Sequence, residues 1–358
     1  MKTWDAIVVG AGIIGLSLAI ELNKQGLKVL VVEKGEPGRE ASWAAGGMLA
    51  DFPAETPPAL RELASASAAM YPEFVRELED ESGLKIDLRS VGTLLFLHEP
   101  PASDVLAERG WLARWHELEP ALKAPNLRAK DLAGVYLKER CVDPRDLTAA
   151  AIATVRRHRS INFSSGNHVL TVEVAEGKAC GVRTNKTQFH AGMVVNCAGA
   201  WAGQIGPHRF PTRPVKGQML CVIMPRKELV SHVIRTPDVY LIPRSDGRMV
   251  IGATSEEVGF DKQTLPETIR KLRQAAIEVV PKLVEARFLQ AWAGLRPGTP
   301  DGLPILGATP TAGYFVATGH FRDGILLAPV TAKLVAQMMM GQTAEMEVSK
   351  FSTQRLGI

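Results

Sequence analysis

The chain has 358 residues, of which 46% are hydrophobic and 22% charged, and its formal net charge is +4. This is the composition of a folded globular protein, and the length predicts two domains or one large interleaved pair. The small net charge and the lack of a dense Lys/Arg block argue against a nucleic acid as partner.

The chain start predicts a βαβ unit. Residues 6–9 form an apolar strand, a Gly-Ala-Gly-Ile-Ile-Gly turn follows at 10–15, a helix runs to about Lys24, and residues 28–33 form a buried strand. The same stretch superficially resembles a signal peptide, but Asp5 interrupts it and no small-residue cleavage site follows. It is also too short to span a membrane.

The glycine motif G-x-G-x-x-G has the context of a dinucleotide site. It lies between a strand and a helix, and Glu33 ends the next strand. Gly10 permits the tight turn, Gly12 lets the backbone approach a pyrophosphate, and Gly15 allows close helix–strand packing. The N-terminus of the helix adds partial positive charge beside the pyrophosphate. The Glu33 carboxylate would accept hydrogen bonds from the ribose hydroxyls and would repel a 2′-phosphate. The alternative is a βαβ unit without a ligand.

The middle of the chain predicts antiparallel structure. Residues 56–84 are predicted to be helical, with Pro72 in the first turn of a second helix. Ser-Asp-Gly at 245–247 is typical of a hairpin. The remaining predictions are strands 91–97, 193–197, 239–243, 248–253 and 314–318, helices 147–158, 266–280 and 325–340, and a hairpin at 176–178.

Two further loops favour FAD over a nicotinamide cofactor. Residues 38–50, GREASWAAGGMLA, form a small-residue loop that lets the backbone approach a planar ring. Residues 317–329, ATGHFRDGILLAP, place a helix start near residue 325, whose free N–H groups would face the cofactor. A reduced flavin carries negative charge that such a helix start stabilises.

Arg296 lies in WAGLRPGTPDGLPILG, a run of small, apolar and turn-forming residues. A lone guanidinium is costly to bury there without an anion, and it pairs bidentately with carboxylates. The sequence therefore favours a clamp for a substrate carboxylate. The alternative is a structural arginine paired with Asp301 or with backbone carbonyls.

Seven motifs together resemble the D-amino acid oxidase family, and within it the thiamine-pathway glycine oxidase branch. They are VVGAGIIGLSLA, ASWAAGGML, CVDPRDLTAA, VVNCAGAWA, VYLIPRSDGRMVIGAT, WAGLRPGTPDGLPILG and GHFRDGILLAP. The resemblance covers nearly the whole chain. It implies non-covalent FAD and an α/β fold in which a Rossmann-like FAD-binding domain is interleaved with an α+β substrate domain that contains a mixed or antiparallel sheet.

The resemblance also implies how the chain divides. Residues 1–84, 141–214 and 290–358 are expected to form the FAD-binding domain. Residues 85–140 and 215–289 are expected to form the substrate-binding domain.

Matched position by position, the resemblance implies two catalytic residues, Arg296 and Tyr240, and the place of Arg322 in the flavin-edge loop makes it a third candidate. Arg296 would pair with the substrate carboxylate, Tyr240 would be the active-site tyrosine, and Arg322 would contact substrate or flavin O4. The implied cofactor-binding residues are Gly10, Gly12, Ile13, Ile14, Gly15, Glu33, Lys34, Ala41, Ser42, Gly46, Gly47, Met48, Val169, Gly199, His320, Phe321, Arg322, Asp323, Gly324, Ile325 and Leu326. No metal is expected.

Three residues depart from the family pattern. Ser255 stands where a glycine oxidase has Met, Asp323 replaces the usual Asn near the flavin edge, and Trp43 adds bulk to a small-residue loop. His320 is expected to serve its loop rather than acid–base chemistry.

The expected activity is FAD-dependent oxidative deamination of glycine or small D-amino acids. A hydride would pass from Cα to flavin N5 and on to O2, and the products would be a 2-oxo acid, ammonia and H2O2, with a place in thiamine thiazole biosynthesis. The alternatives are an amine dehydrogenase that uses a quinone or protein acceptor, and a non-catalytic or RNA-modifying flavoprotein.

The expected partners are a small amino acid or amine substrate and O2. Four widely spaced cysteines without a C-x-x-C pair favour reduced thiols and a cytoplasmic protein without a membrane span. Homo-oligomerisation is left open.

Overall fold

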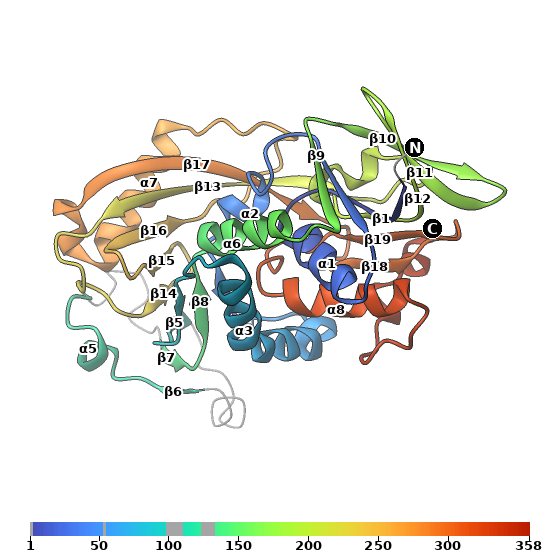
Figure 1. Ribbon diagram of the computed structural model, residues 1–358. Coiled ribbons are helices and arrows are strands. Elements are labelled where there is room, and N and C mark those ends of the chain that lie inside the picture. Colours follow the sequence, from blue (N-terminus) through green and yellow to red (C-terminus); the bar gives the residue numbers. More distant parts are fainter. Residues whose placement is uncertain (1–2, 53–54, 98–109, 123–132) are drawn as a thin grey trace.

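A computed structural model describes residues 3–52, 55–97, 110–122 and 133–358 of the chain. Part of the predicted segment 85–140 lies outside these residues. Two eight-stranded sheets, each faced by helices, and one small three-stranded sheet make up the described fold (Figure 1). The α/β architecture with one Rossmann-like sheet and one mixed sheet is therefore confirmed. The helices are α1 (Ile13–Lys24), α2 (Ala41–Ala44), α3 (Arg61–Ser82), α5 (Trp115–Leu118), α6 (Pro144–Arg157), α7 (Pro266–Val279) and α8 (Ala328–Met339).

The first sheet contains the predicted βαβ unit. Its central strand β1 pairs in parallel with β2 on one side and with β12 on the other, and β9 and β19 extend the parallel part. An antiparallel hairpin continues beyond β12, and its turn lies at the predicted residues 176–178. The strands are β1 (Trp4–Val9), β2 (Val29–Glu33), β9 (Ile161–Ser165), β10 (Val169–Ala175), β11 (Lys178–Thr184), β12 (Gln188–Asn196), β18 (Ile305–Ala308) and β19 (Tyr314–Thr318).

The second sheet has the order β17-β13-β16-β15-β14-β5-β7-β6. Its pairs are antiparallel except for the parallel pair of β14 and β5, and the predicted turn at 245–247 joins β15 to β16. The strands are β5 (Thr93–Leu97), β6 (Gly110–Leu112), β7 (Ala133–Leu137), β13 (Arg213–Ile223), β14 (Val233–Arg235), β15 (Tyr240–Pro243), β16 (Arg248–Gly252) and β17 (Arg287–Gly298). A third, smaller sheet joins β3 (Met48–Leu49), β8 (Arg140–Val142) and β4 (Leu88–Arg89).

Strand continuity suggests different domain boundaries from those expected. A boundary at 290 would cut β17, and a boundary between 214 and 215 would cut β13, although these two strands pair along their whole length. We propose that residues 213–298 belong to the substrate-binding domain.

The prediction that Pro72 starts a second helix was wrong, because α3 runs through it without a break. A proline inside a helix removes one N–H and frees the carbonyl four residues earlier. That carbonyl belongs to Ala68, and it accepts a 3.4 Å bond from Nη1 of Arg140. A side chain from β8 thus compensates for the proline.

The helix predicted at 325–340 begins later, at Ala328, and residues 324–327 form a turn. Two side chains of α3 fix this turn. The Tyr71 hydroxyl donates to the Ile325 carbonyl at 2.5 Å, and the Ser67 hydroxyl donates to the Leu326 carbonyl at 2.6 Å. Both hydroxyls are buried, so the turn is held by groups that the local sequence does not reveal.

Replacement of Tyr71 by Phe should lower the free energy of unfolding by about 1–3 kcal/mol, because it leaves the buried Ile325 carbonyl without its donor. Urea unfolding of the holoprotein measures this. Tyr136→Phe is the matched control, since the Tyr136 hydroxyl donates to an exposed carbonyl, that of Val91. If the free energy of unfolding falls equally in the two variants, the buried Tyr71 hydrogen bond stabilises the protein no more than the exposed one.

Candidate active site

A cavity of about 550 Å³ lies between the first sheet and the inner face of the second. It runs from the glycine turn after β1 to the end of β17. All the predicted site residues line it except Gly15 and Leu326. A β-carbon on Gly15 would lie 2.0 Å from the Gly10 carbonyl oxygen, so Gly15 serves helix–strand packing. Leu326 is buried behind the wall.

Backbone forms the wall at the glycine turn. Gly10 has a φ of +103°, and a β-carbon there would lie 2.6 Å from the Cys197 carbonyl oxygen. Gly12 faces the cavity, and the Ser42 hydroxyl accepts the N–H of Ile13 at 2.9 Å at the start of α1. The glycine turn therefore exposes backbone without side chains to the cavity, as the approach of a pyrophosphate requires. The Ser42 bond holds this turn against the small-residue loop 38–50.

Glu33 is buried at the end of β2, and its carboxylate orders the loops beside it. It accepts the N–H groups of Ala11 at 2.8 Å and Gly35 at 2.9 Å. Next to it, the Lys34 ammonium lies 3.0 Å from the centroid of the Trp201 ring. Burial lowers the pKa of Lys34, although the negative charges of Glu40 and Glu33 act to raise it. Trp201 was not identified from the sequence, although it is the penultimate residue of the quoted motif VVNCAGAWA.

The small-residue loop 38–50 forms another wall of the cavity, and this wall is also made of backbone. Gly47 has a φ of +81°, and a β-carbon there would lie 2.0 Å from the Val142 carbonyl oxygen. A β-carbon on Gly46 would lie 2.7 Å from Cδ1 of Ile242 on the second sheet. Trp43 does not line the cavity, because its ring packs against Trp292 and the Arg145 guanidinium.

The loop at 320–325 forms the cavity wall nearest α8. His320 is buried, its Nε2 lies 3.1 Å from the Thr331 hydroxyl, and burial lowers its pKa to about 3. It is therefore a neutral group, which supports the interpretation that it serves the loop. Burial raises the pKa of Asp323 to about 6, although Arg322 opposes the shift.

Tyr240, Arg296 and Arg322 converge on one part of the cavity. The Tyr240 ring lies over Gly252 on the neighbouring strand, where a β-carbon would be 2.8 Å from the ring. Burial raises the pKa of Tyr240, while Arg296 and Arg322, both close to it, act in the opposite direction. The phenol is accordingly a neutral hydrogen-bonding group.

Arg296 extends across β13 and over Gly217, where a β-carbon would lie 2.4 Å from Nη1. This nitrogen donates to the Thr254 carbonyl at 3.0 Å. The alternative partner Asp301 is wrong, because Asp301 pairs with Arg355 at 2.8 Å. Among the described residues no carboxylate pairs with Arg296, so its charge is available to a ligand in the cavity.

A charged group beside Tyr240 was not predicted. Arg235 lies opposite Tyr240 in the β14–β15 pair and also lines the cavity. It pairs with Glu55 at 3.0 Å and Glu139 at 2.7 Å, and it is buried. The three residues come from distant segments, so no local sequence pattern indicates that they meet.

Two kinds of site find no support in the described part of the chain. No group of three or more His, Cys, Asp or Glu side chains there could hold a metal ion. No helix in the same ranges has both the length and the apolarity that crossing a membrane requires.

These walls fit a dinucleotide that carries a flat ring. The turn at α1 has room for a pyrophosphate, Glu33 lies at the end of β2, where a ribose is expected, and the Gly46–Gly47 loop leaves room for a ring beside Tyr240 and Arg296. The fold and the cavity together define a flavin-dependent oxidoreductase.

Comparison with known proteins leads to the same class. The family model DAO, described as FAD dependent oxidoreductase, matches residues 5–338. The chain belongs to this family of FAD-dependent oxidoreductases, and its cofactor is therefore FAD. A glycine oxidase from Pseudomonas aeruginosa is 35% identical over 355 residues, which cover 94% of each chain.

Two further relatives extend the comparison. A bifunctional protein ThiO/ThiG from Trichormus variabilis is 34% identical over 99% of this chain, and the chain spans about half of that relative's length (55%). The crystal structure of glycine oxidase from Geobacillus kaustophilus superimposes with a TM-score of 0.90 at 29% identity and covers 98% of both chains.

Asp323→Asn should stabilise the holoprotein at pH 8 but not at pH 4. Because burial raises the folded-state pKa from 3.8 to about 6, the native protein binds this proton more tightly than the unfolded chain, and stability is lost as pH rises through about 6. The gain at pH 8 should be about 1–3 kcal/mol. Urea unfolding of both proteins at the two pH values measures it. A gain that does not depend on pH would contradict the assignment.

Proposed function

We propose that this protein is an FAD-dependent oxidase of glycine or small D-amino acids. The observation that carries the proposal is Arg296, a guanidinium that has no carboxylate partner in the described part of the chain and that lines the same cavity as the Gly46–Gly47 loop. The names of the relatives, glycine oxidase above all, support this substrate class. For glycine, the overall reaction converts glycine, O2 and water into glyoxylate, ammonia and H2O2.

The protein's part in this reaction is to position the substrate. Arg296 binds the carboxylate through two parallel N–H···O bonds, and the Tyr240 hydroxyl donates to the same carboxylate. Arg322 provides a second positive charge near them. Bound FAD supplies the hydride acceptor.

The substrate amine must lose a proton before it can lose a hydride. His320 is not the base, because its buried imidazole bonds to Thr331 and its pKa is far below neutrality. We assign this proton to solvent or to backbone carbonyls. Ser255 lines the cavity and is the first residue to consider for the size of side chain that is accepted.

Two wider assignments belong to this proposal. The family resemblance and the matching ThiO/ThiG relatives support a place in thiamine thiazole synthesis, with O2 as the electron acceptor. The four cysteines are free thiols, which supports a cytoplasmic location.

Arg296→Ala should lower kcat/KM for glycine by about 10- to 100-fold, mainly through KM, because a charge-assisted pair with the carboxylate is lost. Gly217→Ala should act in the same direction without removing the charge, since its β-carbon displaces the guanidinium. Steady-state kinetics and the visible absorbance of bound FAD measure both effects. Unchanged KM in both variants would place the carboxylate elsewhere.

Glycine, D-alanine, D-proline or sarcosine should bleach the visible flavin band under anaerobic conditions, and each turnover in air should yield one H2O2. Anaerobic spectrophotometry and a peroxide assay measure this. If no amine of such a panel bleaches the flavin, the proposed function is wrong. Rapid bleaching followed by slow reoxidation and little peroxide would indicate a dehydrogenase instead.

A further inference from the structure

Arg244 connects the substrate-binding sheet to the flavin-facing loop. It directly follows β15, the strand of Tyr240, and only 2% of it is exposed. Its Nη2 donates to the Gly46 carbonyl at 2.6 Å, and its Nη1 donates to the Val142 carbonyl at 3.0 Å. One guanidinium thus holds two backbone segments that are far from it in the sequence.

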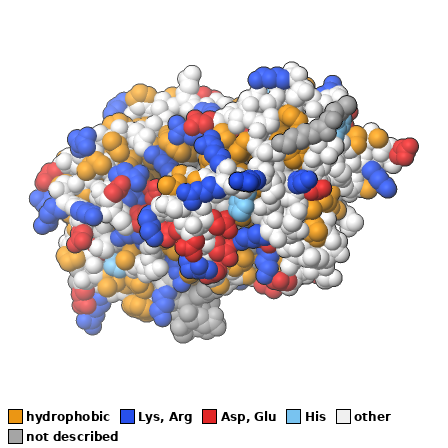
Figure 2. All heavy atoms as spheres, in the orientation of Figure 1, with side chains coloured by type: hydrophobic (Ala, Val, Ile, Leu, Met, Phe, Trp, Pro, Cys, Tyr) orange, Lys and Arg blue, Asp and Glu red, His pale blue; other side chains and the backbone are white. Residues whose placement is uncertain are grey.

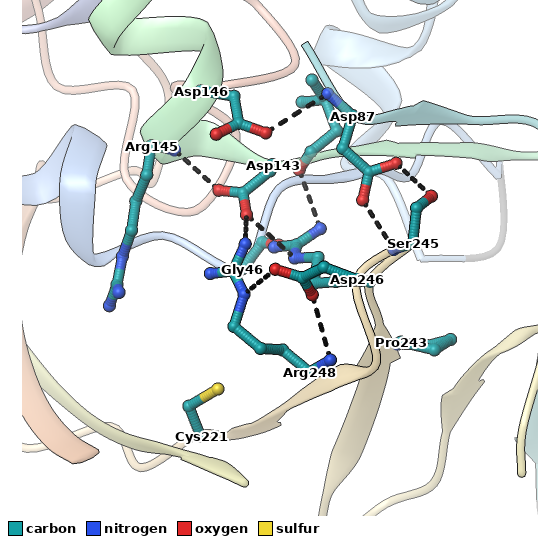
Figure 3. A network of polar contacts seen from close by, with 12 residues as sticks. Gly46, Asp87, Asp143, Arg145, Asp146, Cys221, Pro243, Ser245, Asp246 and Arg248 are labelled. Atoms are coloured by element: carbon teal, nitrogen blue, oxygen red, sulfur yellow. Dashed lines mark hydrogen bonds and ion pairs between the residues drawn. The ribbon is translucent and has the colours of Figure 1, made fainter. Parts of the chain in front are cut away.

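The turn around Arg244 is anchored by carboxylates at the start of α6 and next to β4 (Figure 3). Asp143, also 2% exposed, accepts the N–H of Arg145 at 2.9 Å and so caps α6. Its other oxygen accepts a 2.9 Å bond from Arg248 and lies 3.6 Å from Nε of Arg244.

A second carboxylate fixes the same turn. Asp87 accepts the backbone N–H of Ser245 at 2.9 Å and the Ser245 hydroxyl at 2.6 Å. The turn end of the β15–β16 hairpin therefore has a fixed position relative to α6 and to β4.

The two cavity walls are in close contact at the place that Arg244 spans. A β-carbon on Gly46 would lie 2.7 Å from Cδ1 of Ile242 and 3.5 Å from Cε2 of Tyr240. Only three residues separate Tyr240 from Arg244 along the chain. A change at Arg244 would thus alter the separation between the wall that binds the flavin and the wall that binds the substrate.

We propose that Arg244 is a positioning residue of the reaction, which fixes the Gly46–Gly47 loop against the strand of Tyr240 and so sets the distance between the flavin face and the bound substrate. This inference rests on the proposed function. Arginine suits the role because its planar fork reaches two carbonyls at once, whereas a lysine ammonium provides one point of contact.

The test compares Arg244→Lys with Arg248→Lys in the holoenzyme. Both residues contact Asp143, but of these two arginines only Arg244 donates a hydrogen bond to the Gly46 carbonyl. Arg244→Lys should lower kcat by about a hundredfold, because hydride transfer is sensitive to displacements near 1 Å, and should change KM much less. It should also shift the visible spectrum of bound FAD and weaken FAD binding. Arg248→Lys should retain the kcat and the spectrum.

Wild-type kcat, FAD spectrum and FAD dissociation constant in Arg244→Lys would overturn the proposal, as would equal effects in both variants. If Arg244→Lys does not fold, Arg244→Gln takes its place, because it keeps one amide donor and Asp143 keeps Arg248. If no amino acid reduces the wild-type flavin, the proposed function fails, and the spectrum and dissociation constant still decide the role of Arg244.

Discussion

The cavity exists because glycines occupy the positions where its two walls come closest together. Gly12 and Gly46 face the cofactor from the FAD-binding side, and Gly217 and Gly252 lie beneath Arg296 and Tyr240 on the other side. In each case a β-carbon would fall within 3.2 Å of another group. Protein interiors are otherwise close-packed, so a space for a flat ring between two sheets exists only where the sequence leaves out side-chain atoms.

Three buried or half-buried arginines lie around this space, and their different hydrogen-bond and ion-pair partners give them different roles. Arg235 is neutralised by Glu55 and Glu139, and it forms part of the wall. Arg244 is bound by two carbonyls and lies near Asp143, so its donors hold the loop in place. Arg296 has a single carbonyl partner among the described residues, and its charge remains to be matched by a substrate.

Local pattern predicted the elements that bind the cofactor. The strand, glycine turn and helix at the chain start, both hairpins and the two small-residue loops follow from short-range signals. The errors at Pro72 and at the start of α8 have a common cause, since Arg140 in one case and Ser67 and Tyr71 in the other supply bonds from distant segments.

The same reason explains which site residues were missed. Trp201 could have been found from its motif, but Gly217 and Gly252 matter only through the side chains that lie over them. The group formed by Arg235 and the contacts of Arg244 arise from tertiary structure alone. The surroundings of Arg296 in the sequence already favoured a carboxylate clamp, whereas only the family resemblance indicated a role for Tyr240. The strand register then explained why the two residues meet.

The most direct measurement is a crystal structure of the holoprotein with glycolate, an isostere of glycine that has a hydroxyl in place of the amine. Its carboxylate should bind the Arg296 guanidinium within hydrogen-bond distance of the Tyr240 hydroxyl, and its Cα should lie over the flavin ring. A carboxylate bound elsewhere in the cavity, with Arg296 occupied by protein groups alone, would contradict it.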